Sequence, residues 1–320
     1  WLVTARVADS GTIRATSPLK AMPWLAPASW VLQTMAVFFL VGGMVTARGR
    51  AASAEPYGRW LRARVSRLLR PVAAVPVVWL PAAGLMFALG ADPGTVLGLL
   101  RLGYAPLWFL GVYLILTAAT PVAARVHPAW PVAAVALADL IRYGTAGPDW
   151  PGWVNVVTAW LVPYCLGAWW ARREPPGRAT GWALLLGGAA ATAALVLWAG
   201  YPASMVGVPG APISNQSPPT IAAVTFGLAQ CGAAALLLPR LRAWLRRPAA
   251  WATVALVNLA AMPIFLWHQT AMIMVTALGL AAGTPLPGLH TPPFDPAWIP
   301  ARLAWLPAFA AALLPLVFLF

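Results

Sequence analysis

Long runs of apolar residues, each close to the length that crosses a lipid bilayer, constrain this sequence more than any other feature. A helix needs about 20 apolar residues to cross the hydrocarbon core. Inside lipid the backbone must satisfy its own hydrogen bonds, which a helix does within one segment. The sequence therefore predicts an all-α fold, a polytopic transmembrane helix bundle with about nine spans, at 29–47, 71–90, 105–123, 130–143, 153–170, 181–199, 219–238, 252–281 and 302–320.

Composition agrees with a membrane protein, because 61% of the residues are hydrophobic and only 9% are charged. Soluble domains carry about 25% charged residues. The formal charge of +14 could suggest a nucleic-acid binder, but the arginines stand in short groups between apolar runs, as in cytoplasmic loops of membrane proteins. Cys165 and Cys231 lie within apolar runs and are expected to pack there. We expect neither nucleic acid nor a metal ion as a partner.

The basic residues are distributed unevenly between successive connections. Most of the 21 Lys and Arg residues fall in every second connection, and the largest group lies between 48 and 70. The intervening connections carry few, and Arg302 is counted among these. Cytoplasmic loops are the basic ones, so residues 1–28 are predicted outside and the C-terminus in the cytoplasm, as in a multi-pass protein of the plasma membrane.

The same alternation requires one further span before Trp1 if the intact protein begins in the cytoplasm. The chain also begins without an initiator Met. We therefore expect residues 1–320 to form a single membrane domain that lacks its first helix, out of ten in the intact protein. We also expect the chain from Trp1 onward to be inactive by itself.

The densest group of charges is YGRWLRARVSRLLRPV, residues 57–72. One interpretation is an anchor for anionic lipid headgroups beside the membrane. The other is a site for a polyphosphorylated ligand, because guanidinium groups match phosphate oxygens. The spacing of the charges by itself leaves both interpretations open.

Two further motifs lie in apolar runs. FLWHQT, residues 265–270, places His268 in the outer half of the bilayer, where an ionisable residue is costly and suggests a functional site. Imidazole suits proton transfer near neutral pH, although an interhelical hydrogen bond is the simpler explanation. PLWFLGVYL, residues 106–114, contains Trp108, which could equally belong to an interfacial aromatic belt.

The outer connection 201–220 has no charged residue and contains Ser214, Asn215 and Ser217. These neutral hydrogen-bonding groups suit a hydroxyl-rich substrate, but a compact loop that caps the helix ends would need them too. Asp139 and Arg142 are three residues apart and are expected to form a local ion pair at an outer helix end. A carboxylate facing the bundle could instead orient a catalytic histidine.

Taken together, these segments resemble the acyltransferase-3 family of bacterial membrane proteins, and in particular its actinobacterial branch. The resemblance extends over nearly the whole chain. It rests on the order and spacing of VFFLVGG (37–43), RVSRLLRP (64–71), PLWFLGVYL (106–114), SNQSPPT (214–220) and FLWH (265–268).

The resemblance implies transfer of an acyl group, most simply acetyl, from acyl-CoA to a hydroxyl of a carbohydrate or another cell-envelope acceptor. The RxxR motif of the family matches Arg64 and Arg67, and the tryptophan of its WFL segment matches Trp108. All three are implied in binding the acyl-CoA co-substrate, and no permanently bound cofactor is expected. The principal catalytic histidine of the family would lie before Trp1, which leaves His268 as a secondary catalytic candidate beside Asp139. The acceptor would bind at Ser214, Asn215 and Ser217, and membrane lipids are the remaining partners.

The main alternative is a transporter or flippase for a lipid-linked or hydrophobic substrate. Transporters of this kind usually show internal repeats and spans interrupted at corresponding positions of the two halves. The sequence shows neither feature, so an O-acyltransferase is the preferred interpretation. A lipid-binding scaffold, in which the arginines only set the topology, is the third possibility.

Overall fold

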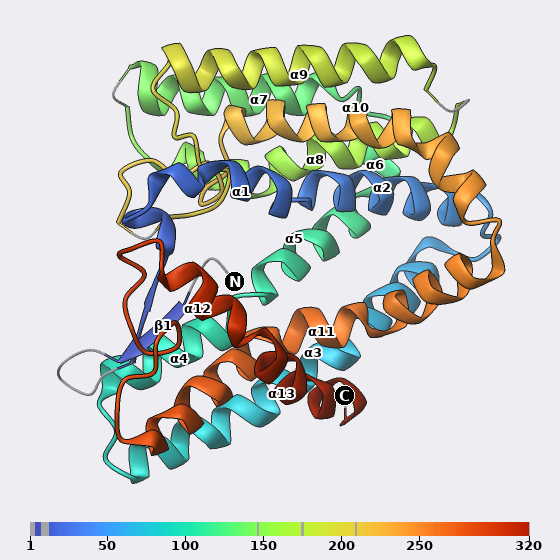
Figure 1. The fold of residues 1–320 in the computed structure, drawn as a ribbon. Coiled ribbons are helices and arrows are strands. Elements are labelled where there is room, and N and C mark those ends of the chain that lie inside the picture. The colour runs from blue at the N-terminus through green and yellow to red at the C-terminus, as the bar shows by residue number, and fades with distance from the viewer. Residues whose placement is uncertain (1–3, 8–12, 146, 174–175, 209, 320) are drawn as a thin grey trace. The chain divides into compact units, whose positions relative to one another are not determined.

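The computed structural model describes residues 4–7, 13–145, 147–173, 176–208 and 210–319. Helices dominate these ranges, as predicted (Figure 1). The strands within them are β1 (Thr4–Val7) and β2 (Ile13–Thr16), which pair antiparallel with Thr4 opposite Thr16. Short helical turns follow at Pro18–Lys20 and Pro23–Leu25, and a further short helix, α6, at Thr120–Ala123.

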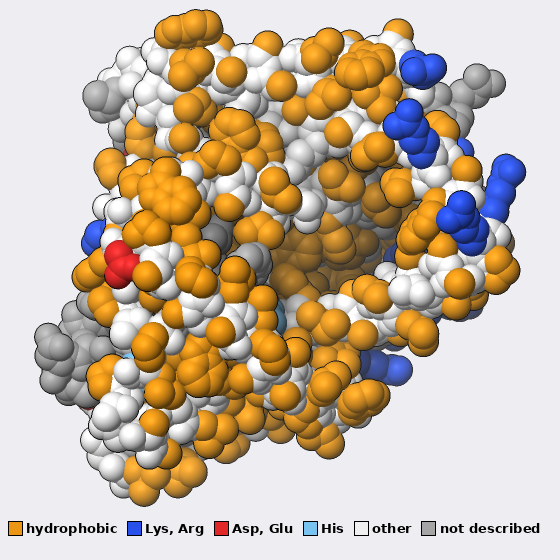
Figure 2. Space-filling model, viewed as in Figure 1, with side chains coloured by type: hydrophobic (Ala, Val, Ile, Leu, Met, Phe, Trp, Pro, Cys, Tyr) orange, Lys and Arg blue, Asp and Glu red, His pale blue; other side chains and the backbone are white. Residues whose placement is uncertain are grey.

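Eight helical segments of the described chain are long and apolar enough to cross a membrane. The protein is therefore a multi-pass membrane protein with an all-α transmembrane bundle. Hydrophobic side chains cover most of the surface seen in Figure 2. The segments are Pro23–Ala51 (with α1, Ala26–Leu32, and α2, Met35–Ala51), Tyr57–Ala88 (α3), Pro93–Ala118 (α4, Pro93–Tyr104, and α5, Leu107–Ala118), Pro151–Ala171 (α8), Arg178–Trp198 (α9), Ile221–Trp244 (α10), Pro248–Ala282 (with α11, Pro248–Gly279) and Trp298–Leu319 (α12, Trp298–Ala304, and α13, Leu306–Leu319).

The segment predicted as a span at 130–143 is helical but shorter than the others. It forms α7 (Ala129–Asp139), which continues as a π-helical turn over Leu140–Gly144. At 1.5 Å per residue the two together extend about 24 Å, less than the roughly 30 Å of hydrocarbon that a full crossing requires. α7 packs against α8, so this segment belongs to the bundle without having the length of its neighbours.

The chain divides into two compact units. One unit contains residues 1–25, 64–110 and 248–320, and the other contains residues 26–63 and 111–247. Two of the four boundaries fall inside α3 and α5, so each of these helices contributes residues to both units. We call the first the histidine unit, because it contains His268, and the second the loop unit, because it contains the connection 199–220.

In the loop unit, pairs of helices approach so closely that their backbones touch. A Cβ atom on Gly43 of α2 would overlap the Tyr164 carbonyl of α8, and one on Gly167 of α8 would overlap the Leu40 carbonyl of α2. Such contacts between small residues stabilise helix pairs in membranes, where the hydrophobic effect does not drive helices together. The same kind of contact joins Gly188 of α9 to α10.

In the histidine unit, α11 is the central helix and packs against α4 and α13. The Trp79 indole N–H of α3 donates a hydrogen bond to the Thr270 hydroxyl of α11 over 3.1 Å. Gly103 of α4 lies against the same indole ring and has no room for a side chain. Trp79 therefore ties α3 and α4 to α11 beside His268.

The close approach of α2 and α8 generates a prediction. Gly167→Ala should lower the thermal unfolding midpoint of the detergent-solubilised protein, because overpacking a tight contact costs about 1–3 kcal/mol. Gly187→Ala is the matched control, because Gly187 is exposed on α9 with open space beside it. The control should leave the midpoint unchanged or slightly raised. Equal midpoints for both variants would contradict the tight contact.

Candidate functional site

The residues singled out in the sequence fall into two groups. Arg64, Arg67, Trp108 and His268 belong to the histidine unit. Asp139, together with the connection that contains Ser214, Asn215 and Ser217, belongs to the loop unit. Each group is described within its own unit.

His268 is half-buried on α11, and its own helix fixes the orientation of its ring. The Nδ1 atom lies 2.8 Å from the Phe265 carbonyl oxygen. A carbonyl only accepts, so Nδ1 carries the proton in the neutral ring and Nε2 keeps its lone pair. Nε2 has no hydrogen-bond partner among the residues that the structure describes. This tautomer leaves Nε2 able to accept a proton from a ligand.

A row of aromatic rings connects Trp108 to His268. The Trp108 and Phe109 ring centroids are 6.2 Å apart, those of Phe109 and Phe265 are 5.2 Å apart, and those of Phe265 and His268 are 6.2 Å apart. These separations lie within the usual range for interacting rings. The row links two predicted site residues, from α5 and α11, through successive ring contacts.

Arg64 and Arg67 lie near the start of α3, three residues apart and therefore on the same side of the helix. Arg64 is half-buried and Arg67 is exposed. Trp79 follows Arg67 by twelve residues, about 18 Å along the helix, and it is bonded to Thr270, two residues after His268. α3 thus extends from the two arginines to the level of His268.

Asp139 is buried, and its carboxylate joins four parts of the loop unit. The Asn155 amide donates to Oδ1 over 3.0 Å, and Oδ2 accepts from the Tyr201 hydroxyl over 3.1 Å and from the Ile221 N–H over 2.7 Å. Arg142 lies 4.0 Å from Oδ1, which confirms the predicted local ion pair. Burial, followed by the charge of Asp139, raises the pKa of Tyr201, so its hydroxyl stays a donor. Within the described chain no histidine contacts this carboxylate, so a role in orienting one remains a prediction.

The connection 199–220 is held together by its own side chains. The buried Asn215 donates to the carbonyls of Pro202 and Ser204, over 2.6 and 3.0 Å, and accepts from the Thr220 hydroxyl over 2.7 Å. The Ser214 hydroxyl oxygen accepts the N–H groups of Gln216 and Ser217. Asn215 and Ser214 thus organise the loop, whereas the Ser217 side chain is exposed.

The same connection is attached to the start of the bundle. The Met205 N–H donates to the Ser29 hydroxyl over 2.9 Å, and the Trp30 indole donates to the Ala203 carbonyl over 2.6 Å. These contacts make the loop a cap on α1, one of the two roles that its composition suggested. Binding of an acceptor by this loop remains a prediction.

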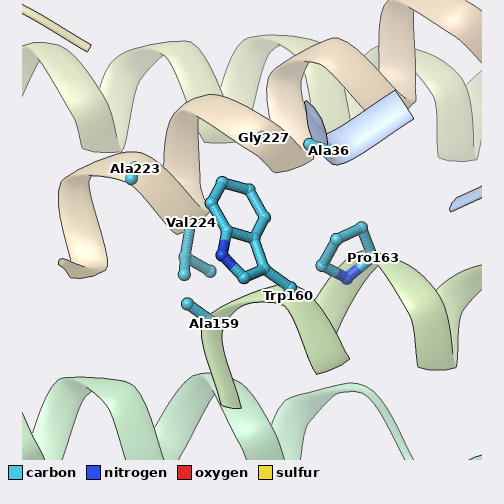
Figure 3. Close-up of a pocket in the computed structure, with 7 residues that line it drawn as sticks. All are labelled: Ala36, Ala159, Trp160, Pro163, Ala223, Val224 and Gly227. Carbon is cyan, nitrogen blue, oxygen red and sulfur yellow. The ribbon is translucent and has the colours of Figure 1, made fainter. Parts of the chain in front are cut away.

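Two hollows of the loop unit lie away from the predicted residues. A cavity of about 10 Å³ holds at most one water molecule and is lined by Ala36, Ala159, Trp160, Pro163, Ala223, Val224 and Gly227 (Figure 3). A groove of about 300 Å³ lies at the end of α10, beside Arg242 and Arg246. The first is too small for a substrate, and neither is lined by a predicted site residue.

Sequence reasoning missed Arg302. The basic-residue pattern assigns it to an outer connection, but in the structure it lies in α12 and only 4% of it is exposed. Two tryptophans, Trp298 and Trp305, flank it within an apolar segment. A charge in such a setting is the signal that could have identified it, because charged side chains inside membrane segments are usually functional.

The Asp139 network generates a second prediction. Asp139→Ala should destabilise the protein by about 3–5 kcal/mol, because the Asn155, Tyr201 and Ile221 donors lose their acceptor and Arg142 loses its buried counter-ion. Asp149→Ala is the control, because Asp149 lies 3.7 Å from the same guanidinium but its side chain is 90% exposed, and exposed pairs contribute about 1 kcal/mol or less. Thermal unfolding in detergent measures both. A small effect for Asp139→Ala would contradict a structural role for its carboxylate.

Comparison with known proteins places these features in a family. A family model described as an acyltransferase domain, that of the acyltransferase-3 family, matches residues 8–320. No curated protein and no solved structure matches the chain. The match includes the start of α3, the aromatic row and α11, which confirms the resemblance inferred from the motifs. The chain belongs to the acyltransferase-3 family and is a membrane acyltransferase.

Proposed function

We propose that this protein transfers an acyl group, most simply acetyl, from acyl-CoA to a hydroxyl of a carbohydrate or another cell-envelope acceptor. The observation that supports this best is the aromatic row from Trp108 to His268, in the unit that also holds Arg64 and Arg67. One unit thus carries cations for phosphates and a ring nitrogen for proton transfer.

In this proposal the phosphates of acyl-CoA bind Arg64 and Arg67 from the cytoplasmic side. Two guanidinium groups on one side of a helix suit phosphate oxygens better than amines do. The acyl end then extends along α3 towards Trp79, about 18 Å further on, and the aromatic row provides an apolar surface for it. A plasma-membrane protein with residues 1–28 outside and its C-terminus inside would accept donor and acceptor from opposite sides.

The chemical step is attack of the acceptor hydroxyl on the thioester. His268 Nε2 takes the proton of the hydroxyl, and the oxygen forms a bond to the carbonyl carbon. The carbon–sulfur bond breaks, and the proton passes to the departing thiolate, which leaves as free coenzyme A. Of the residues that the structure describes, His268 is the one we propose for this proton transfer.

The role of His268 is testable in the full-length protein. His268→Ala should lower kcat by about 10²–10⁴-fold, the usual contribution of a general base. His127→Ala is the control, because His127 is exposed and packs on Trp169 in the loop unit. The measurement is release of coenzyme A by membranes given acetyl-CoA and an envelope extract. Full activity of His268→Ala would remove it from the mechanism, and substrate uptake without acyl transfer would favour a transporter.

The donor site is testable separately. Arg64→Gln and Arg67→Gln should each raise the KM for acetyl-CoA about 10–100-fold, because a hydrogen bond to a charged group contributes about 1.5–3 kcal/mol. Arg62→Gln is the control, an exposed arginine of the same helix outside the matched Arg64–Arg67 pair. If the arginines only anchor lipid, all three variants will keep the wild-type KM and will instead bind anionic vesicles more weakly.

A further inference from the structure

Arg302 is a buried cation without a matching anion in the described part of the chain. One of its amino groups donates to the Gly288 carbonyl oxygen over 3.3 Å, and the other lies 3.5 Å from the Met272 sulfur. A guanidinium has five N–H donors, and thioether sulfur is a weak acceptor. Most of these donors therefore have no oxygen acceptor among the described residues, and no carboxylate there pairs with the charge.

Aromatic rings hold the guanidinium in place. Its central carbon lies 4.5 Å from the Phe309 ring centroid and 5.9 Å from that of Trp298. Cation–π contacts offset part of the cost of burying a charge, but they leave its N–H groups unpaired. A charge kept inside a membrane segment at such cost is expected to meet a partner of opposite charge.

The position of Arg302 relative to His268 follows from Met272. Met272 stands four residues after His268 on α11, so both side chains lie on the same side of the helix, about 6 Å apart along its axis. The Arg302 guanidinium touches the Met272 sulfur. It therefore lies one helical turn beyond the proposed base, towards the end of α11 that the basic-residue pattern predicts outside.

We propose that Arg302 binds a phosphate group of the acceptor, so that a hydroxyl of the same molecule reaches His268. This role rests on the proposed function of His268, whereas phosphate binding itself does not. The planar guanidinium matches phosphate oxygens, and a phosphate has an oxygen for a third N–H group that a carboxylate lacks. The phosphate can come from a lipid-linked acceptor or from a soluble one.

Binding to the purified full-length protein in detergent tests the proposal without any acyl transfer. The probes are glucose 1-phosphate, polyprenyl phosphate, glucose and glucuronate. Glucose 1-phosphate should bind the wild type and should bind Arg302→Gln at least about tenfold more weakly, as expected when a charge-assisted contact is lost. Arg101→Gln is the matched control, an exposed arginine at the end of α4 in the same unit, and should bind like the wild type. Tighter binding of polyprenyl phosphate identifies a lipid-linked source, and tighter binding of glucose 1-phosphate a soluble one.

Several outcomes would overturn the proposal. Equal binding of glucose or glucuronate would show that the phosphate is not recognised, and wild-type affinity in Arg302→Gln would show that this residue is not used. If Arg302→Gln does not fold, Arg302→Lys decides, because it keeps the charge without the planar fork and should bind a few-fold more weakly; unchanged affinity would contradict the proposal. His268→Ala should keep phosphate binding. If an Arg302 variant loses phosphate binding but keeps acyl transfer, the result counts against the role of Arg302 alone. If the wild type binds phosphate through Arg302 but transfers no acyl group, the result counts against the proposed function alone.

Discussion

Inside a bilayer, backbone hydrogen bonds can be satisfied only within the protein, and the rest of this structure depends on that constraint. Helices meet it segment by segment, so the polar side chains are left to join one helix to another. Trp79 and Thr270 do this in the histidine unit, and Asp139 does it in the loop unit. Where no polar bond is available, glycines such as Gly43 and Gly167 allow direct backbone contact instead.

The number of hydrogen bonds that a polar side chain makes within the protein also distinguishes residues that stabilise the fold from residues that are available for chemistry. The oxygens of Asp139 and the amide of Asn215 are fully engaged by neighbouring groups. His268 uses one nitrogen on its own helix, and Arg302 uses few of its donors on described residues. The His268 ring and the Arg302 guanidinium therefore keep nitrogen atoms available for a ligand. Measured along the α11 axis they lie about one helical turn apart, in the unit that also holds the arginines of the family motif.

The sequence predicted the fold well because the length of an apolar run is a local property. Eight of the nine predicted spans are long apolar helices, and the ninth, α7 with its π-helical turn, is shorter than a full crossing requires. The family motifs indicated candidate site residues but not the contacts that these residues make. Asp139 bonds to Tyr201 and Ile221, which are 62 and 82 residues away, and the aromatic row joins α5 to α11. Such contacts depend on which helices are neighbours, and apolar periodicity does not encode that.

The hydrogen bond between His268 and the Phe265 carbonyl has a consequence for how this protein can diversify. The direction of Nε2 is set within one turn of α11 and needs no group from another helix. Surrounding helices can therefore change their side chains, or shift during turnover, without redirecting the proposed base. Selection for a new acceptor could change the side chains that line the site while His268 Nε2 keeps its position and direction.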